Sequence, residues 1–570
     1  MKAILIFINL LASNFCLAQF VSLPQVPNPT LGVYMSALGS DSNAGDSLHP
    51  VASFSKALDI LVTASNNMSG EVYAEVILFE GLYNQALNQN LNKFQLTNRE
   101  LNVSVRGRGI ATLDGTLISN LSSGSGMVHL LGSGISVKNI HILYSPANGV
   151  RFGYNYNGTI INSQDIQIEN VEVAATAGHG ILVGIGALNT ASPFTLTPMG
   201  ERFLIQNCSV HDAVNFNTVQ NQWGSAIKAW NARHVTIRNC IVRDNGGEGI
   251  DFDECDSVDV YANETQDNVV GIYLDKVTNA WVHRNYISNA NKKAPGMLYA
   301  MEGYSSLISN YYVKNIRIFN NLLLNTQGIG FWQGAYGANQ NGYFDNIEIT
   351  HNTIIGKQTG NGSCVHFNFE TFLGQPVPNV HFNQIKMERN LIAASPDSLN
   401  NNQLVFASLP VPGFSAAYNV YSQAIWQNMA SSTDIIDATI PVSISNIANA
   451  IPGSGLIPMN LVPSSWLSTD FNLTQRFVPQ TAAGAFEYAI VGLEEYANES
   501  IRIYPNPSHG ELSIIGIQKG PFLVIDETGQ IKFQGIYQHG QTIDLSKLNN
   551  GYYLISFPTD GVFSRVVLMR

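Results

Sequence analysis

Charged residues recur between apolar ones in three short segments of the chain. Lys228, Asp251, Asp253 and Asp275 each follow an aliphatic or aromatic residue. Alternate residues of a β-strand point to opposite faces, so we expect the apolar residues to point inward and these four to point outward. Carboxylates gathered on one face can act as general acids and bases or bind Ca²⁺, and a lysine of lowered pKa can act as a base.

Aromatic and histidine residues extend this outward strip. Trp230 and Tyr273 take the same outward positions as the charged residues, and a less regular continuation adds Trp332 and His366. His179 lies in a Gly-His-Gly segment just before another such strand. Aromatic rings offer apolar faces to sugar rings. We therefore predict a polysaccharide groove with these five residues as its substrate-binding residues.

The first functional hypothesis is a polysaccharide lyase. Ca²⁺ would neutralise a uronate carboxylate of the substrate, and Lys228, or Arg284 in its place, would remove the neighbouring proton. A lysine can do this only if its pKa is strongly lowered. The predicted metal ligands are Asp251, Asp253, Glu254, Asp256 and Asp275.

Two further hypotheses stay open. An inverting glycoside hydrolase needs two carboxylates roughly 6.5 to 9.5 Å apart, which the pair Asp251 and Asp253 or the pair Asp253 and Asp275 can supply. Alternatively, the protein is a non-catalytic carbohydrate-binding or adhesive surface protein. Its aspartates would then only solvate a sheet face, and Lys228 would pair with Asp251 across strands.

A repeat in the sequence predicts the element that positions these residues. Asn239, Asn263 and Asn285 each close a phrase of alternating apolar residues, and they lie 24 and 22 residues apart. Such a period suits one coil of a parallel β-helix, in which each coil buries its core against its neighbours. We predict an all-β fold of about ten to twelve coils. The asparagines would form a structural ladder at a left-handed turn.

The N-terminal part of the repeat resembles a known family. Residues 34–45, followed by 49–58, resemble the opening motif of secreted right-handed parallel β-helix proteins of the pectate-lyase-like superfamily. In that superfamily the motif leads into a helix that caps the first coil, here predicted from Phe54 to Ser65. Its pectate and alginate lyases use Ca²⁺ and a basic residue, so the resemblance implies the lyase hypothesis. The Gly-His-Gly around His179 is similar to that of polygalacturonase-like β-helices, without the aspartate motifs that precede it there.

The two ends of the sequence indicate export. Lys2, an apolar run and Ala18 predict a signal peptide over residues 1–18. The β-helix domain is expected over 19–490, with irregular final coils from about 395 to 490. Residues 491–570 read as a small β-sandwich. Their Tyr504-Pro505-Asn506-Pro507 and later strands resemble the type A C-terminal sorting domain of the type IX secretion system. The resemblance implies that the secretion machinery is a partner and that the protein is secreted or at the cell surface.

Composition excludes several other classes of function. The formal net charge is −12 and only 12% of residues are charged, which argues against nucleic acid as a partner. After residue 18 no apolar run reaches the roughly 18 to 20 residues of a membrane span. We also expect the protein to be a monomer. Cys208 and Cys240 fall in one register of neighbouring coils, where either a disulfide or a stack of thiols fits.

Overall fold

The chain divides into two compact units, Met1–Tyr488 and Ala489–Arg570. The computed structural model describes residues 21–436 and 502–568 apart from interruptions, together with residues 467, 484 and 485. The longer interruptions are 85–100, 185–199, 215–223, 303–309, 335–340, 357–363, 369–378, 394–403 and 423–430. The predicted signal peptide and most of the predicted closing coils lie outside the described residues.

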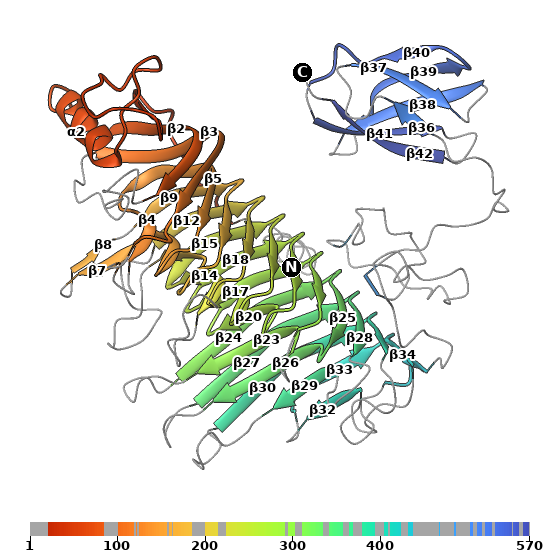
Figure 1. Cartoon of the computed structure of the whole chain (residues 1–570). Helices are drawn as coiled ribbons and strands as arrows, with labels where there is room; N and C mark the ends of the chain where they lie inside the picture. Colours follow the sequence, from red (N-terminus) through yellow and green to blue (C-terminus); the bar gives the residue numbers. More distant parts are fainter. Residues whose placement is uncertain are drawn as a thin grey trace, which may run out of the picture. The chain divides into compact units, whose positions relative to one another are not determined.

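The larger unit is a parallel β-helix, as predicted. Its coils stack in sequence order, and each complete coil gives one strand to each of three faces (Figure 1). The first face, here called the ten-strand sheet, contains β4 (Gly126–Leu130), β6 (Asn148–Phe152), β11 (Ile181–Gly184), β14 (Ser225–Trp230), β17 (Glu248–Asp253), β20 (Ile272–Asp275), β23 (Met297–Glu302), β26 (Ile329–Gly334), β29 (Val365–Asn368) and β32 (Val405–Ala407).

The second face, the long ladder, follows the ten-strand sheet within each coil. It contains β1 (Leu31–Met35), β2 (Val72–Asn84), β3 (Leu101–Asp114), β5 (Ser133–Leu143), β9 (Gln164–Glu169), β12 (Gly200–Gln206), β15 (Ala232–Arg238), β18 (Asp256–Tyr261), β21 (Thr278–His283), β24 (Asn310–Phe319), β27 (Asn341–Thr350), β30 (Asn379–Glu388) and β33 (Phe414–Ala417).

The third face, the short ladder, closes each coil. It contains β10 (Glu172–Ala174), β13 (Ser209–His211), β16 (Ile241–Arg243), β19 (Glu264–Gln266), β22 (Tyr286–Ser288), β25 (Leu322–Thr326), β28 (Thr353–Gly356), β31 (Leu391–Ala393), β34 (Val420–Tyr421) and β35 (Ile435–Ile436). A separate antiparallel pair, β7 (Tyr154–Tyr156) and β8 (Thr159–Ile161), follows β6.

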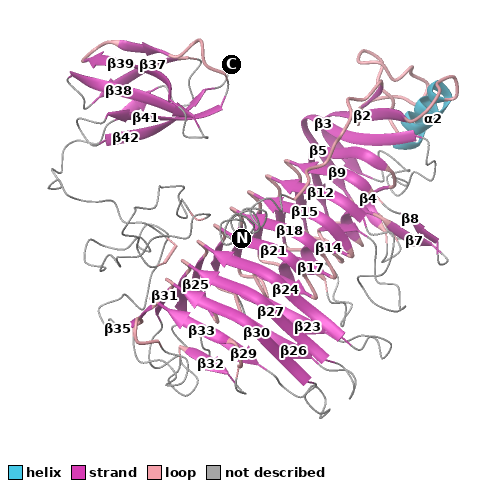
Figure 2. Ribbon diagram, turned by 180° about the vertical axis from the view of Figure 1, so that it is seen from behind, coloured by secondary structure: helices cyan, strands magenta, loops and turns pink. Residues whose placement is uncertain are grey.

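The predicted capping helix is confirmed at the N-terminal end of the β-helix. Helix α2 spans Phe54–Ser65, as predicted, and buries Phe54, Ala57 and Leu61. The hydroxyl of Ser53 accepts a hydrogen bond from the Lys56 amide at 3.1 Å, which satisfies one of the free amides of the first turn. Figure 2 shows α2 at one end of the stack of strands. Among the described residues, no helix has the length and apolar character of a membrane span.

The asparagine ladder exists, but one of its predicted members is wrong. The side-chain amides of Asn263, Asn285 and Asn321 are hydrogen-bonded in sequence, each at 3.0 Å. Pairing of β16 with β19 places Cys240, not Asn239, opposite Asn263. Asn239 has a φ of 54° and so occupies the left-handed position one residue earlier. In the next two coils the left-handed residues are Ala262 and Arg284, so the buried ladder of Asn263 and Asn285 does not lie at the left-handed turn as predicted.

The two cysteines at this position are free thiols. Cys208 and Cys240 lie in neighbouring coils, one residue before the paired strands β13 and β16. Both are buried in the core. Burial raises the pKa of the Cys208 thiol well above its usual value. Of the two predicted alternatives, the structure has the stack of thiols.

The C-terminal unit is made of antiparallel strands with its own core. One sheet contains β36 (Arg502–Tyr504), β37 (Glu511–Ile515) and β40 (Thr542–Asp544). The other contains β38 (Lys519–Asp526), β39 (Ile531–Gln538), β41 (Gly551–Phe557) and β42 (Val562–Leu568). Leu512, Val524, Ile555 and Phe557 are among the residues that fill the core. This arrangement has the two-sheet pattern predicted from the sequence.

The ladder gives a first testable prediction. The Oδ1 atom of Asn285 accepts hydrogen bonds from the backbone and side-chain amides of Asn263, and both residues are buried. An Asn285→Ala change leaves buried donors without an acceptor, so we expect a loss of about 2 to 4 kcal/mol in the free energy of unfolding, measured with urea. An Asn341→Ala change removes an exposed amide from the long ladder and should cost less than about 1 kcal/mol. Equal losses would contradict a structural role for the buried ladder.

Candidate functional site

The predicted register of the outward residues is confirmed. Strands β11, β14, β17 and β20 are neighbours in the ten-strand sheet, and their pairing lines up two outward columns. The first column runs Leu182, Lys228, Asp251, Tyr273, and the second runs Gly184, Trp230, Asp253, Asp275. We call the charged and aromatic part of this face the acidic strip: Lys228, Trp230, Glu248, Asp251, Asp253, Glu254, Tyr273, Asp275, Lys276 and Glu302.

Lys228 pairs with two aspartates of the acidic strip. Its Nζ atom lies 2.7 Å from Oδ2 of Asp251 on the neighbouring strand and 3.6 Å from Oδ2 of Asp253. The same ammonium group lies 5.1 Å from the ring centroid of Trp230. The hydroxyl of Ser225 donates a hydrogen bond of 2.6 Å to the Asp251 oxygen. Asp251 is thus held by one charged and one neutral donor.

A second lysine, which sequence reasoning missed, lies on the other side of Asp253. The Nζ atom of Lys276 lies 3.3 Å from Oδ1 of Asp253 and 3.8 Å from Glu254, and it forms a short ion pair with Asp275. Lys276 follows the last residue of β20 and has a φ of 54°. The chain turns a corner there, so strand alternation does not predict the direction of its side chain.

The deeper members of the acidic strip have almost no contact with solvent. The side chains of Lys276, Asp275 and Asp251 are 0%, 1% and 2% exposed. The side chains of Asp253 and Lys228 are 10% and 14% exposed. Charges interact more strongly in such surroundings than in water. The ion pairs of the strip therefore differ from ordinary surface pairs, and Asp253 is more accessible than Asp251 or Asp275.

Asp253 is the carboxylate that the lysines keep ionised. Burial raises its pKa, but Lys276 and Lys228 outweigh this effect and hold the pKa below the usual aspartate value. The pKa of Asp251 is raised by burial, against the opposing effect of Lys228. Burial also raises the pKa of Asp275 well above its usual range, with the nearby Asp253 charge adding to the effect. An ionised aspartate thus stands between two that retain their protons more strongly.

Two glutamates bordering the aspartates have pKa values near neutrality. Burial and then the charge of Asp251 raise the pKa of Glu248 to about 7. Burial and then the charge of Asp253 raise the pKa of Glu254 to about 7, although Lys276 opposes this. Sequence reasoning assigned Glu254 only as a metal ligand and did not include Glu248. The charge of the strip therefore changes close to neutral pH.

The electrostatics of Lys228 do not match a proton-abstracting lysine. Burial lowers its pKa, but the charges of Asp251 and Asp253 outweigh burial and raise the pKa above the usual lysine value. A lysine base must be deprotonated near working pH. In the arrangement described here, Lys228 is a permanent cation.

The expected Ca²⁺ ligands are divided between two faces of the β-helix. Asp251, Asp253 and Asp275 lie in the acidic strip, whereas Asp256 begins β18 of the long ladder and accepts hydrogen bonds from Thr278 and Asn279. The lysine ammonium groups occupy the space between the strip carboxylates, where a cation would have to replace them. Among the described residues, no group of three or more His, Cys, Asp or Glu side chains is arranged to hold a metal ion. Calcium binding stays a prediction, and no step below relies on it.

The other expected substrate-binding residues are spread over several strands of the ten-strand sheet and the residues beside it. Tyr273 is in the strip and donates a hydrogen bond of 2.9 Å to Glu302. Trp332 and His366 continue the two columns on β26 and β29, beyond β23. His179 lies beside β14, where its Nδ1 accepts a hydrogen bond of 2.9 Å from the Ser225 amide. Burial, with the charges of Lys228 and Arg151, lowers the pKa of His179 to about 3. His179 is therefore neutral and positions Ser225.

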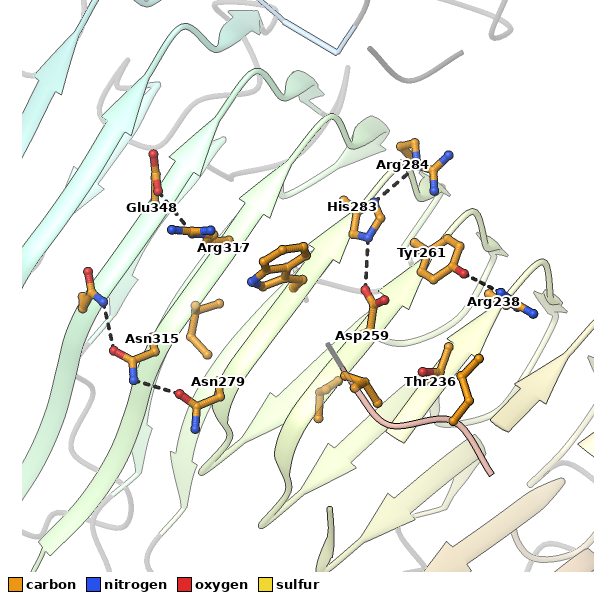
Figure 3. Close-up of a pocket in the computed structure, with 16 residues that line it drawn as sticks. Thr236, Arg238, Asp259, Tyr261, Asn279, His283, Arg284, Asn315, Arg317 and Glu348 are labelled. Carbon is orange, nitrogen blue, oxygen red and sulfur yellow. Dashed lines mark hydrogen bonds and ion pairs between the residues drawn. The ribbon is translucent and has the colours of Figure 1, made fainter. Parts of the chain in front are cut away.

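Arg284 belongs to a different part of the molecule. It follows β21 of the long ladder, where its guanidinium lies 5.2 Å from the Tyr261 ring centroid and donates to His283 at 3.3 Å. Figure 3 shows Arg284 with these neighbours in a pocket on the outer face of the long ladder. Arg284 contacts residues of the long ladder and not those of the acidic strip. We therefore do not retain Arg284 as the base that would remove a substrate proton at the strip.

Comparison with protein families gives two partial matches. Residues 115–295 match the family described as periplasmic copper-binding protein (NosD), and residues 502–566 match the secretion system C-terminal sorting domain. The first match covers the coils that carry Lys228, Asp251, Asp253 and Asp275. No curated protein matches the sequence.

Comparison with solved structures gives distant likenesses. The A-module of mannuronan C-5 epimerase AlgE4 from Azotobacter vinelandii has 13% identity and a TM-score of 0.40, and covers 67% of this chain and 100% of its own. Pectate lyase Pel9A has 15% identity and a TM-score of 0.37, with 83% and 100% covered. XylC in complex with xylose has 9% identity and a TM-score of 0.42, with 80% and 98% covered. The identities are 15% or lower and the TM-scores are below 0.5.

The fold and the sorting domain together define the class of protein. The larger unit is built from stacked parallel coils, and residues 502–566 carry the address that the secretion machinery reads. The chain is therefore an exported parallel β-helix protein, secreted or held at the cell surface, that carries a type IX C-terminal sorting domain.

Proposed function

We propose that the protein is a secreted glycoside hydrolase that cleaves a polysaccharide at the acidic strip. The observation that carries the proposal is the arrangement of Asp251 and Asp253 around Lys228, with their pKa values shifted in opposite directions. Two carboxyl groups whose surroundings separate their pKa values can divide the roles of acid and nucleophile between them. A surface that only binds sugar needs no such division.

In this proposal Asp251 is the general acid and Asp253 is the nucleophile. Asp251 gives its proton to the glycosidic oxygen while the Asp253 carboxylate attacks the anomeric carbon and the bond to the leaving sugar breaks. Water then attacks the resulting ester, and Asp251 takes a proton from that water. The products are one new reducing end and the restored carboxyl pair. The more accessible position of Asp253 suits the attacking group.

The spacing of the two aspartates favours retention of the anomeric configuration. Their facing oxygens lie 2.7 and 3.6 Å from the same nitrogen of Lys228, so they cannot be as far apart as the roughly 6.5 Å minimum of an inverting pair. Retaining enzymes place their carboxyl groups roughly 5 to 5.5 Å apart. The sequence-based hypothesis of an inverting hydrolase therefore changes to a retaining one.

The ion pairs of the acidic strip favour a substrate without carboxylates. Lys228 and Lys276 both already contact aspartates, so neither is left to bind an added uronate carboxylate. A neutral sugar chain needs no such cation and can stack on an aromatic ring such as Trp230. We therefore propose a neutral polysaccharide as the substrate.

The Ca²⁺-dependent uronate lyase predicted from the sequence is the second proposal. One observation favours it: the Oδ1 atom of Asp251 is buried and has no hydrogen-bond partner among the described residues. An unpaired carboxylate oxygen is a possible cation ligand. The two proposals differ in products, since a hydrolase gives saturated sugars and a lyase gives unsaturated ones that absorb ultraviolet light.

The test is an assay of the purified full-length chain on a panel of neutral and uronate-containing polysaccharides, with Ca²⁺ or with chelator. New saturated reducing ends from a neutral polymer, with the anomeric configuration retained by NMR, support the hydrolase. Unsaturated products formed only with Ca²⁺ overturn it in favour of the lyase. Binding on affinity gels with no product from any polymer overturns both and supports a carbohydrate-binding protein.

Substitution of the two aspartates gives the second prediction. Asp251→Asn removes the proposed acid, and we expect kcat to fall about 10²- to 10⁴-fold. Asp253→Asn removes the proposed nucleophile and should reduce kcat at least as strongly, while substrate binding on affinity gels persists. The control is Asp244→Asn, because Asp244 lies at the exposed end of β16 on another face. Wild-type turnover in Asp253→Asn would rule out Asp253 as the nucleophile.

The raised pKa of Glu254 gives a third prediction, on stability. The pKa of Glu254 is about 7 in the folded protein, whereas its ordinary value is 4.5. Between these two pH values the folded state therefore binds the proton more tightly than the unfolded chain does. Stability from this group is therefore present below about pH 4.5 and lost as pH rises towards 7. Because one pKa unit corresponds to about 1.4 kcal/mol, the change is at most about 3 kcal/mol.

Glu254→Gln should reduce this pH dependence. We expect urea unfolding curves of the wild type to show falling stability from pH 5 to 7.5, and a smaller fall in the variant. Glu264→Gln on the short ladder serves as the matched control. A variant with the same slope as the wild type would show that Glu254 does not titrate in this range.

A further inference from the structure

A second concave site lies on the long ladder, on a different face from the acidic strip. Its volume is about 460 Å³, within the usual range of ligand sites. Strands β15, β18, β21, β24 and β27 supply most of its lining (Figure 3), and Val21 and Leu23 of the N-terminal segment also line it. None of the residues proposed for hydrolysis lines this site.

Stacked aromatic rings form much of the floor. The His283 ring stacks on Tyr261 at a centroid distance of 4.9 Å and on Phe319 at 4.6 Å. Trp281 meets the edge of Phe319 at 6.2 Å and is only partly buried. The parallel register holds these rings in neighbouring coils. These stacked rings cover one another's faces. The Trp281 ring lies 5.6 Å from the Arg317 guanidinium and is only partly buried, so it keeps apolar surface at the pocket.

Two arginines of the site form no ion pair among the described residues. Arg238 donates hydrogen bonds to the side-chain oxygens of Gln206 and Tyr261. The shortest bond to each residue is 2.7 Å. The guanidinium of Arg284 contacts the His283 ring nitrogen and lies over the Tyr261 ring at 5.2 Å. Arg238 lies over the same ring at 5.9 Å. Both guanidinium groups thus meet at one tyrosine and neither has a carboxylate partner there.

The two carboxylates that line the pocket are engaged elsewhere. Asp259 lies 3.0 Å from Nε2 of His283, and Glu348 lies 3.6 Å from Arg317. Figure 3 shows these pairs beside the two arginines. The site therefore has an excess of positive charge, in a protein whose net charge is −12. An anionic ligand would supply the missing partner of Arg238 and Arg284.

We infer that this pocket binds an anionic saccharide, with its acid group held by Arg238 and Arg284 and a sugar ring stacked on Trp281. Guanidinium groups bind carboxylates and sulfates through paired hydrogen bonds. An indole face packs against the apolar face of a sugar. The side-chain amides of Asn279 and Asn315, which are hydrogen-bonded to each other at 2.8 Å, border the pocket and can bond to hydroxyl groups. This site binds its ligand without cleaving it, and it is independent of the acidic strip.

The test uses the full-length Asp253→Asn chain, so that turnover does not disturb binding. Calorimetry is performed with hexagalacturonate, a sulfated hexasaccharide and neutral cellohexaose. We expect one or both anionic sugars to bind this pocket, with affinity falling as salt rises, and the neutral sugar to bind it at least roughly tenfold more weakly. Comparison of the two anionic sugars shows whether carboxylate or sulfate is preferred. Equal binding of neutral and anionic sugars that the arginine substitutions described below weaken alike would overturn the inference.

Substitutions assign the binding to this pocket. The pair Arg238→Gln with Arg284→Gln should weaken binding roughly tenfold or more, whereas Arg243→Gln, an exposed arginine on β16 paired with Asp244, should not. Unchanged affinity in the double variant, with an unaltered circular dichroism spectrum, overturns the assignment. If the double variant does not fold, Trp281→Phe decides: the anionic sugar should change the tryptophan fluorescence of the parent and not of this variant. The same change in both proteins overturns the assignment.

Discussion

Successive coils of this protein are hydrogen-bonded to one another in parallel, almost residue for residue. This register converts positions that are 22 to 36 residues apart in the sequence into neighbours on one face. It brings Lys228 beside Asp251 and stacks His283 between Tyr261 and Phe319. Both proposed sites are therefore columns of side chains, and neither depends on a single loop.

Stacking also concentrates charge, and the acidic strip shows how the protein accommodates it. Taking carboxylates out of water is costly unless they are paired or protonated. The strip uses both solutions, because Lys228 and Lys276 keep Asp253 ionised while Asp251 and Asp275 hold their protons more strongly. The same division of protons that makes the cluster tolerable gives it an acid and a nucleophile. In the pocket on the long ladder positive charge is in excess, since Arg238 and Arg284 lack carboxylate partners among the described residues.

Sequence periodicity was sufficient to predict the parallel β-helix and the columns of the strip, and the family resemblance predicted the capping helix. A strand has a period of two, so the outward position of Asp251 and Asp253 follows once the coil is recognised. The prediction failed where the chain turns a corner, and it therefore missed Lys276 and placed Asn239 one position away from its true register. Nor does periodicity predict proton affinities, which depend on burial and on neighbours from other coils. Lys228 had the position expected of a base but not the required pKa.

The central claim is that Asp253 loses its proton at a lower pH than its neighbours Asp251 and Asp275. Infrared difference spectroscopy measures this directly, because a protonated carboxyl group has a carbonyl band that a carboxylate lacks. In a pH titration we expect the protonated bands that are lost in Asp251→Asn and in Asp275→Asn to appear at a higher pH than the band that is lost in Asp253→Asn. A band of Asp253 that appears at the same pH as theirs, or at a higher pH, would contradict the claim.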